Sequence, residues 1–541
     1  MQRRFAGGCW LSLASAVVFL GCGGGGGGGG GGPPAAFLFY TNQSDKVGLW
    51  AVDPTAASPA KIEIEDASTP VMSPTLVEAG SWGGTSGRIT DVYTRQLVYG
   101  KDAGGGSANL YQLDARAAST ALTPVQLSSF ADPLCSMVAE PDYANPENSL
   151  VFTTSPGADG NCGTTSDNVV HMISLSSGAS DAPIEFAAGA TLVGVVRSTS
   201  SGAIEDLLVL YAGDLWAGMP PGAAEDLGAV GSASLVAEWA GRTWLNVDNA
   251  LKYFDLATSE LDDPVGGPIT FSTTPVFALD ATHLFFSETS AGATINGILL
   301  DSSAESYTVH DLDGAQSIDL LQSAKNSLVY RDHTTGIWYG VPKSGGAPAE
   351  LLVPQAAADS FSVHVSGPMV YITDAGTNVN ATSIKEDGTG RVDYPGSATE
   401  SFAWCAMGDS TIHMSTSRLD NPRYVVLVDA GDSDVALTSY DGPTGTQIAA
   451  LGNITGVDSQ IAYGIANASG DATLFAAGLG ESKIWSVKAT TANSAVLIDT
   501  SPSGKFLAPV GSSGCTTGGT GSLAAIGLTL LALLRRRRPA R

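Results

Sequence analysis

One short phrase recurs along most of this chain: an apolar strand, a polar turn, and a second strand built on a hydrophobic–aromatic pair. Helical periodicity is nearly absent between residues 36 and 506. Short apolar runs bounded by Gly, Asp and Ser predict β-strands joined by tight turns. Ten copies can be counted, beginning near residues 36, 96, 150, 207, 244, 284, 327, 370, 412 and 460. The body of the chain is therefore expected to be all-β.

The spacing of the copies narrows the fold. From Trp244 to Ile412 they start 40–44 residues apart, which is the length of a four-stranded propeller blade. Small sheets stacked around an axis bury both apolar faces without long exposed edges. The aromatic residues expected to pack between blades are Trp50, Tyr111, Trp216, Tyr253, Trp338 and Trp485. We expect a single β-propeller over residues 35–508 with about eight blades (range seven to ten), while a flat solenoid or two sandwich domains stay as alternatives.

The repeated phrase resembles those of the TolB-like and dipeptidyl-peptidase-type propellers. In these families an Ile/Leu–Tyr/Trp pair follows a strand and a turn, as Ile337 and Trp338 follow the strand at residues 327–330. The resemblance covers most of the body and implies the propeller fold, without carrying over the activity of any one family.

The N-terminal segment up to Pro34 reads as an export signal and a tether. Residues 1–21 combine Arg3 and Arg4 with a short apolar run, as in a secretory signal peptide. The sequence VFLGC at residues 18–22 resembles the bacterial lipobox, which implies cleavage between Gly21 and Cys22 and lipidation of Cys22; an ordinary signal peptide is the alternative. Residues 22–34 then form a flexible Gly/Pro tether, whose ten glycines span about 18 Å.

The C-terminal segment, residues 509–541, resembles a second targeting signal. Small residues around Cys515 lead into an apolar segment, expected to be a transmembrane helix, and then into a basic cluster of Arg535, Arg536, Arg537 and Arg538. This order resembles the myxobacterial C-terminal sorting signal, which implies cleavage near the cysteine and delivery to the cell surface. A plain C-terminal membrane anchor is the alternative. Both ends therefore predict export to the outer membrane or cell surface, with membrane attachment through a lipid, a C-terminal anchor or both.

Charge limits the choice of partner. The chain has 53 acidic and 26 basic residues, and its formal net charge is −27. Such a field repels nucleic-acid phosphates and anionic lipid headgroups, so nucleic acid is not expected to bind.

Two cysteines of the body could form a bond in an exported protein. Cys135 and Cys162 flank one predicted hairpin, and an oxidising compartment permits a disulfide between them.

The sequence contains none of the common catalytic motifs considered. The chain has no G-x-S-x-G elbow, no Walker-type loop, no C-x-x-C, and no pair of histidines at metal-ligand spacing. Acidic turns at residues 311–314, 386–390 and 429–434 offer oxygen ligands, but none completes a calcium loop. We expect no catalytic residue, no cofactor and no metal, with calcium at the acidic turns as the one alternative.

Three functions remain in competition. The favoured one is a cell-surface-anchored propeller lipoprotein that binds or scaffolds an extracellular polysaccharide or protein without catalysis. The second is an exported propeller enzyme acting on polysaccharide, as a lyase or glycosidase; carboxylates beside Arg, His or Tyr at the mouth of the funnel would favour it. The third, suggested by the TolB-like phrase, is a periplasmic subunit of an envelope complex.

Overall fold

The computed structural model describes most of the repeat-bearing body. The residues it describes are 37–42, 47–53, 56, 58–82, 89–116, 122–163, 167–176, 182–239, 241–353, 360–366, 368–375, 379–394, 402–408, 422–430, 434–441, 444–455, 461–466, 472–477, 483–488, 490–500 and 504–507. Over these ranges the chain is nearly all β-strand, with one 3-10 turn, η3 (Pro146–Asn148), and no α-helix. The expected all-β class is confirmed.

Hydrogen bonds divide the described strands into nine sheets, and every pairing is between neighbouring antiparallel strands. The first sheet runs in the order β40-β1-β2-β3-β4-β5-β6. Its strands are β40 (Gly504–Leu507), β1 (Leu38–Asn42), β2 (Val47–Val52), β3 (Lys61–Trp82), β4 (Ile89–Gly104), β5 (Ser107–Asp114) and β6 (Val125–Phe130).

The next four sheets follow along the chain, each with its strands in sequence order except for the short β19 beside β17. They contain β7 (Ser136–Glu140), β8 (Leu150–Ser155), β9 (Val169–Ser174) and β10 (Ile184–Glu185); β11 (Thr191–Arg197), β12 (Ile204–Tyr211), β13 (Asp214–Gly218) and β14 (Glu225–Ala229); β15 (Ala233–Trp239), β16 (Arg242–Val247), β17 (Ala250–Asp255), β18 (Glu260–Asp262) and β19 (Ile269–Thr270); and β20 (Pro275–Leu279), β21 (His283–Glu288), β22 (Thr294–Leu299) and β23 (Tyr307–Asp311).

Four further sheets complete the described part of the body. They contain β24 (Ile318–Ser323), β25 (Ser327–Asp332), β26 (Trp338–Pro342) and β27 (Ala349–Leu352); β28 (Ser360–Ser366), β29 (Met369–Ala375), β30 (Val379–Lys385) and β31 (Val392–Tyr394); β32 (Phe402–Gly408), β33 (Pro422–Ala430), β34 (Asp434–Asp441) and β35 (Gln447–Thr455); and β36 (Ile461–Ala466), β37 (Ala472–Ala477), β38 (Ile484–Lys488) and β39 (Val496–Asp499).

The seven-stranded sheet consists of two groups of four strands that share β3. Residues of β3 up to Pro70 pair with β2, whereas those from Val71 onward pair with β4. Ser73, just after this change of partner, has a positive φ of 42°. The described strands thus form ten groups of four, two more than the eight expected and at the upper end of the range. The number of groups exceeds the expected eight because each of the longer early copies forms a group of its own. The first two groups are also joined through the continuous strand β3, with no turn between them.

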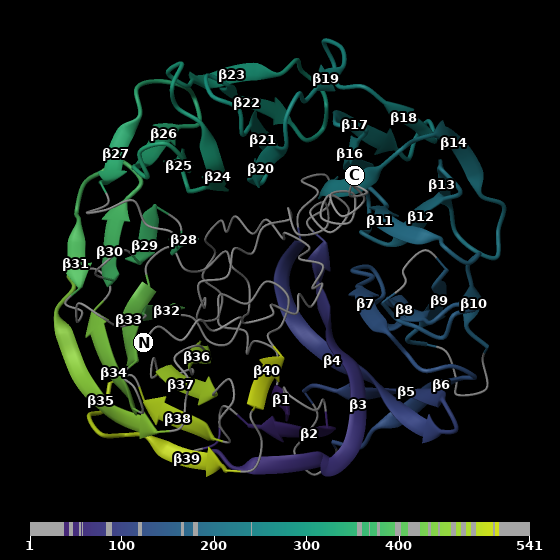
Figure 1. Cartoon of the computed structure of the whole chain (residues 1–541), viewed down its shortest axis with the longest axis horizontal. Helices are drawn as coiled ribbons and strands as arrows, with labels where there is room; N and C mark the ends of the chain where they lie inside the picture. The colour runs from purple at the N-terminus through teal and green to yellow at the C-terminus, as the bar shows by residue number, and fades with distance from the viewer. Residues whose placement is uncertain are drawn as a thin grey trace, which may run out of the picture.

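The groups follow one another around a ring, as Figure 1 shows. In this view β7, β11, β20, β24 and β28 lie toward the inside, and β10, β14, β27, β31 and β35 lie toward the outside. The two ends of the described body meet, because β40 pairs with β1 over Phe39–Leu507 and Tyr40–Phe506. This pairing brings together the first and the last strand of the described body.

The apolar core lies between neighbouring sheets. One cluster joins Trp244 and Leu251 of one sheet to Leu284 and Phe286 of the next. Another cluster continues from Phe285 across to the strands of the following sheet. This is the side-by-side stacking that the repeat predicts, since each small sheet has two apolar faces to bury.

The repeated aromatic residues occupy a constant position within the groups. Trp50 stands opposite Tyr40, and Tyr111 stands opposite Tyr99, as stacked pairs with ring centroids 5.6 and 5.7 Å apart. The same register joins Trp244 to Tyr253 and Tyr330 to Tyr339. Of the aromatics expected between sheets, Trp50, Tyr253 and Trp338 are buried, whereas Tyr111, Trp216 and Trp485 are half-buried. Their role in the core is confirmed for the first three and partial for the others.

Candidate functional site

A buried set of charged residues joins four consecutive groups of strands. We call it the Arg197 cluster and define it as Glu78, Glu140, Tyr143, Arg197 and Glu238. Glu78, Glu140, Arg197 and Glu238 lie on β3, β7, β11 and β15, the first strands of their groups, at or near the C-terminal ends. Strands in equivalent positions run in the same direction around a ring, so their ends meet at one rim.

Arg197 is the centre of the cluster. Its Nε donates to a carboxylate oxygen of Glu238 at 2.8 Å, and one Nη lies 3.4 Å from a carboxylate oxygen of Glu140. The other Nη donates to the carbonyl oxygen of Pro141. Only 1% of Arg197 is exposed, so this guanidinium bridges the sheets on either side out of contact with water. A planar fork with donors in several directions is suited to three such acceptors, which an ammonium group could not satisfy together.

Tyr143 covers the guanidinium from the connection between β7 and β8. The Arg197 guanidinium carbon lies 4.9 Å from the centre of the Tyr143 ring, a cation–π contact. The connection is held by Asp142, whose carboxylate accepts the backbone N–H groups of Ala144 and Asn145 at 3.0 and 2.9 Å. Burial raises the pKa of the Tyr143 hydroxyl well above its usual value, which keeps it neutral.

Glu78 is the least compensated member. It is 3% exposed, and neither carboxyl oxygen has a hydrogen-bond partner among the described residues. Burial raises the pKa of Glu78 well above its usual value, because an ionised carboxylate loses its hydration there. The pKa of Glu140 is raised to about 8 by burial and then by the charge of Glu238, against the opposing effect of Arg197.

The chemistry open to this cluster follows from its burial. Two carboxyl groups, those of Glu140 and Glu238, face one guanidinium, and the pKa of Glu140, raised to about 8, favours its neutral acid form near neutral pH. A protonated carboxyl beside a tyrosine is a general acid when a substrate can reach it. Glu78, Glu140, Tyr143 and Arg197 are all buried, so in this conformation the cluster acts as a cross-link between sheets.

A second polar set resembles a catalytic triad in outline only. The Ser155 hydroxyl lies 2.8 Å from Nε2 of His171, and Nδ1 of His171 lies 3.7 Å from a Glu185 carboxylate oxygen. The second distance is too long for a hydrogen bond, and Glu185 is largely exposed. Ser155 is buried and the His171 ring packs edge-on against Phe130. Burial lowers the pKa of His171, so the pair is a neutral hydrogen bond within the sheet.

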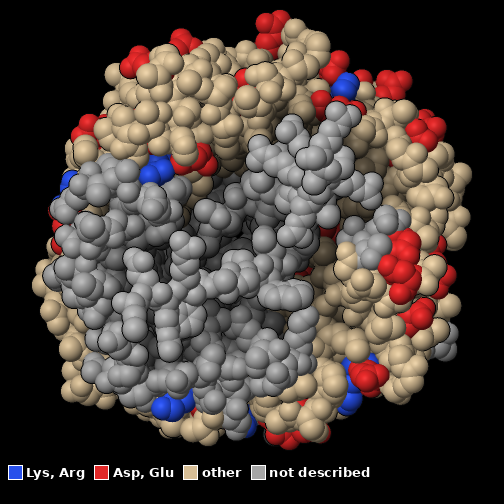
Figure 2. All heavy atoms as spheres, in the orientation of Figure 1, with Lys and Arg blue, Asp and Glu red and all other residues tan. Residues whose placement is uncertain are grey.

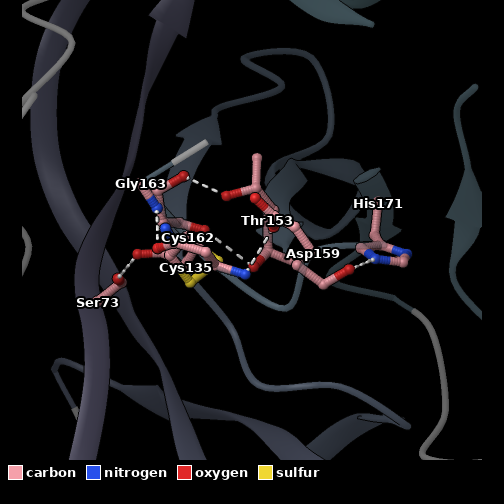
Figure 3. Close-up of a disulfide and its surroundings, with 11 residues drawn as sticks. Ser73, Cys135, Thr153, Asp159, Cys162, Gly163 and His171 are labelled. Atoms are coloured by element: carbon pink, nitrogen blue, oxygen red, sulfur yellow. Dashed lines mark hydrogen bonds between the residues drawn. A yellow bond between two sulfur atoms is a disulfide. The ribbon is translucent and has the colours of Figure 1, made fainter. Parts of the chain in front are cut away.

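The predicted disulfide is present beside this pair (Figure 3). Cys135 and Cys162 are bonded across 27 residues, with their Cα atoms 5.3 Å apart. The Ser73 hydroxyl donates to the carbonyl oxygen of Cys135 at 3.3 Å, which ties the bend of β3 to the disulfide. The pairing expected from the sequence is confirmed.

One of the acidic turns considered for calcium, residues 386–390, uses its carboxylates within the protein. The Glu386 carboxylate accepts the backbone N–H groups of Asn326 at 2.9 Å and Ser327 at 3.1 Å in the neighbouring sheet. Asp387 accepts the N–H and hydroxyl of Thr389 at 2.9 and 2.6 Å. The described ranges contain no group of three His, Cys, Asp or Glu residues arranged to hold a metal ion. Calcium binding stays a prediction.

The other sequence-predicted site residues lie outside the described residues. These are Gly21 and Cys22 of the lipobox, and Cys515, Arg535, Arg536, Arg537 and Arg538 of the C-terminal signal. Within the part of the chain that the structure describes, no helix is long and apolar enough to cross a membrane.

Sequence reasoning missed the Arg197 cluster, although a signal for it exists. Each of its strand residues directly follows a short apolar run: LV before Glu78, MVA before Glu140, VV before Arg197 and LVA before Glu238. A charge at the end of a buried strand is unusual enough to suggest a buried ion pair. The contacts among these four residues could not be predicted from the sequence, because each residue lies in a different copy of the repeat, far from the others along the chain.

Comparisons with known proteins give no family. No family model matches this sequence, and neither does any curated protein. Among solved structures, a prolyl endopeptidase is similar over 75% of this chain and 55% of its own, at 8% identity and a TM-score of 0.33. The dihydro-heme d1 dehydrogenase NirN is similar over 66% of this chain and 72% of its own, at 13% identity and a TM-score of 0.34.

A puromycin hydrolase gives 71% and 57% coverage of the two chains, 14% identity and a TM-score of 0.28. This chain thus spans little more than half the length of the prolyl endopeptidase and the puromycin hydrolase. At such TM-scores we transfer neither mechanism nor substrate from these proteins.

Proposed function

We propose that residues 35–508 form one closed β-propeller, exported and held at the outer membrane or cell surface, that binds or scaffolds an extracellular polysaccharide or protein. Closure is supported by the pairing of β40 with β1, which brings together the two ends of the described body with its ten four-strand groups. The lipobox at Cys22, the glycine tether and the C-terminal signal support the location.

The observation that favours binding over catalysis is the burial of the Arg197 cluster. Arg197 is directed at Glu238 and Glu140, and it is 1% exposed. A ring cross-linked in this way is a rigid support, and the turns that join its strands are left to make contacts. In Figure 2 acidic side chains are spread along the rim of the visible face. Such a rim favours a neutral or cationic partner over an anionic one.

Two measurements on the full chain in its own cells test this proposal. Proteinase K applied to intact cells should remove the protein, and the purified mature protein should co-sediment with the cells' own insoluble exopolysaccharide or be cross-linked to a surface protein. Cys22→Ala should abolish surface retention while leaving binding by the purified protein unchanged. Protection from protease in intact cells, with degradation only after outer-membrane permeabilisation, would instead indicate the periplasmic TolB-like subunit.

One observation favours the enzyme as second candidate. Burial raises the pKa of Glu78 and of Glu140, both of which act electrostatically on Tyr143, and carboxyl groups beside a tyrosine are the residue types expected for a lyase or glycosidase. Catalysis at this point would require a conformation in which substrate reaches the cluster. Release of new reducing ends or unsaturated sugars from exopolysaccharide by the wild type, lost in Glu140→Gln, would favour this alternative.

A further inference from the structure

An exposed tyrosine lies at the outer edge of the sheet formed by β20–β23. Tyr307 is the first residue of β23, which lies on the outside of the ring in Figure 1. It stands opposite Gly297 of β22, which in turn stands opposite Phe285 of β21. These three residues therefore share one face of the sheet, and His283, two residues before Phe285, lies on the same face. Phe285 packs against the strands of the next sheet, so this face is turned toward β24–β27.

The Tyr307 ring is held in place although 37% of the residue is exposed. A Cβ atom at Gly297 would lie 2.7 Å from Cζ of Tyr307, so one side of the ring covers the glycine. The Tyr307 hydroxyl donates to the carbonyl oxygen of Lys343 at 3.4 Å. Because one side is covered, the exposed area lies on the opposite side and at the edges of the ring. A ligand can cover an aromatic surface that is already fixed at little cost in conformational entropy.

An imidazole borders this aromatic surface. The His283 ring is edge-on to Tyr307, with ring centroids 6.0 Å apart, and stacks on Phe285 at 5.7 Å. Its Nδ1 and the Thr282 hydroxyl are hydrogen-bonded at 2.8 Å, whereas Nε2 makes no hydrogen bond with the described residues. The side chain of His283 is 28% exposed, so Nε2 can bond to a ligand that lies on Tyr307.

The charges beside the aromatic surface cancel. The Asp280 carboxylate accepts from Lys343 Nζ at 2.8 Å and from the backbone N–H groups of Thr282 and His283, both at 2.9 Å. Lys343 Nζ also lies 5.6 Å from the centre of the Phe285 ring. A charged ligand would therefore meet an ion pair that is already satisfied. An anionic ligand would also be repelled by the formal net charge of −27.

We propose that Asp280, His283, Tyr307 and Lys343, called here the Tyr307 site, bind one neutral sugar residue of a polysaccharide. The C–H face of a pyranose ring covers the exposed side of Tyr307, and sugar hydroxyl groups bond to Nε2 of His283 and to the edge of the ion pair. An apolar surface with a few fixed polar groups beside it is the composition of a small-ligand site.

The size of the Tyr307 site favours a sugar over a protein partner. A stable protein interface buries about 800 Å² on each partner, far more than a single ring and its edge can supply. The inference rests on the proposed function, because it gives the polysaccharide of that proposal a place on the ring and a chemical class.

The cells' own exopolysaccharide, solubilised and divided by anion exchange into a neutral and an acidic fraction, is the probe. Affinity electrophoresis of the full mature protein should show retardation by the neutral fraction and none by the acidic one. Tyr307→Ala should raise the dissociation constant about tenfold, the effect of losing one stacking surface. Tyr307→Phe keeps the ring and should bind within about threefold of the wild type.

Three further variants separate a binding role from a structural one, each first shown by urea unfolding to be folded. Gly297→Ala removes no group of the site, but its Cβ must displace the Tyr307 ring, so it should weaken binding in the same direction as Tyr307→Ala. His283→Ala removes Nε2 and should also weaken binding. Tyr211→Ala is the matched control, because Tyr211 is 39% exposed at the end of β12 in another group, and its binding should be unchanged.

Equal binding by the wild type and Tyr307→Ala would overturn the Tyr307 site and leave the proposed function standing. Preference for the acidic fraction, or an equal loss in Tyr211→Ala, would do the same. A wild type that binds neither fraction but is cross-linked to a surface protein would overturn the site and leave only the protein form of the proposed function. If the wild type binds no partner and is protected from external protease, the proposed function fails together with the site.

Discussion

Replacing Arg197 by methionine should cost about 3–5 kcal/mol of stability, the range for breaking a buried ion pair from one side. The change removes the donors to Glu238, Glu140 and the Pro141 carbonyl, and leaves these acceptors buried. No discount for solvent screening applies, because the Arg197 and Glu238 side chains of the ion pair are only 1% and 12% exposed. Methionine retains most of the apolar volume, so the loss reports on charge and hydrogen bonding more than on packing.

Urea unfolding of the mature protein, followed by tryptophan fluorescence, measures this loss. Arg242→Met is the matched control, since Arg242 also lies over a tyrosine ring and pairs with a carboxylate, Asp255, at 2.9 Å. The two side chains of that pair are 27% and 14% exposed, so we expect a loss of less than about 1 kcal/mol.

A triple variant provides the second comparison. Adding Glu140→Gln and Glu238→Gln to the Arg197 change removes the Glu238 carboxylate that has lost its counterion and the titratable acid of Glu140 beside it, and should recover more than half of the lost stability. The reasoning is refuted if Arg197→Met unfolds at the same urea concentration as the Arg242 control, or if the triple variant is no more stable than the single one.

Three further predictions concern the bond and the ends of the chain. Serine at both Cys135 and Cys162 should lower stability by about 3–4 kcal/mol, because the bond closes a loop of 27 residues; an unchanged urea midpoint would contradict this. Cys22→Ala should give unprocessed precursor or a freely secreted body on immunoblots of cell fractions, whereas unchanged membrane attachment would rule out the N-terminal anchor. Intact mass spectrometry should find a mature chain cleaved near Cys515, and a chain still ending in its arginine cluster would contradict that cleavage.

The repeat could be predicted from the sequence because its parts are close together along the chain. A strand, a turn and a second strand with an aromatic residue lie close together in the sequence, and antiparallel neighbours need only a short turn to pair. Eight of the ten copies are the second and third strands of a group, as at Leu207 and Trp216 on β12 and β13. The copy near Ile412 lies outside the described residues. In the last copy the strand at Ile461 is instead the first of its group, because β37 intervenes.

The number of groups was harder to read. β3 continues from one group to the next without a turn, so its 22 residues contain no turn signal that would mark the boundary between the groups. Some outermost strands are very short, as Ile184 and Glu185 of β10 illustrate, and such strands leave a weak hydrophobic pattern. The estimate of eight groups therefore fell two short of the ten that the pairing defines.

The all-β class, the repeat and a possible disulfide between Cys135 and Cys162 could be predicted from the sequence, because each depends on patterns that are local in the chain, and the structure established the bond itself. The tertiary structure alone decided that β40 returns to β1, and that Arg197 meets Glu140 on one side and Glu238 on the other. The physical reason is the stacking of small sheets around a ring. Stacking brings the ends of first strands together whatever their distance along the chain, and a buried charge gains its partner only from that assembly.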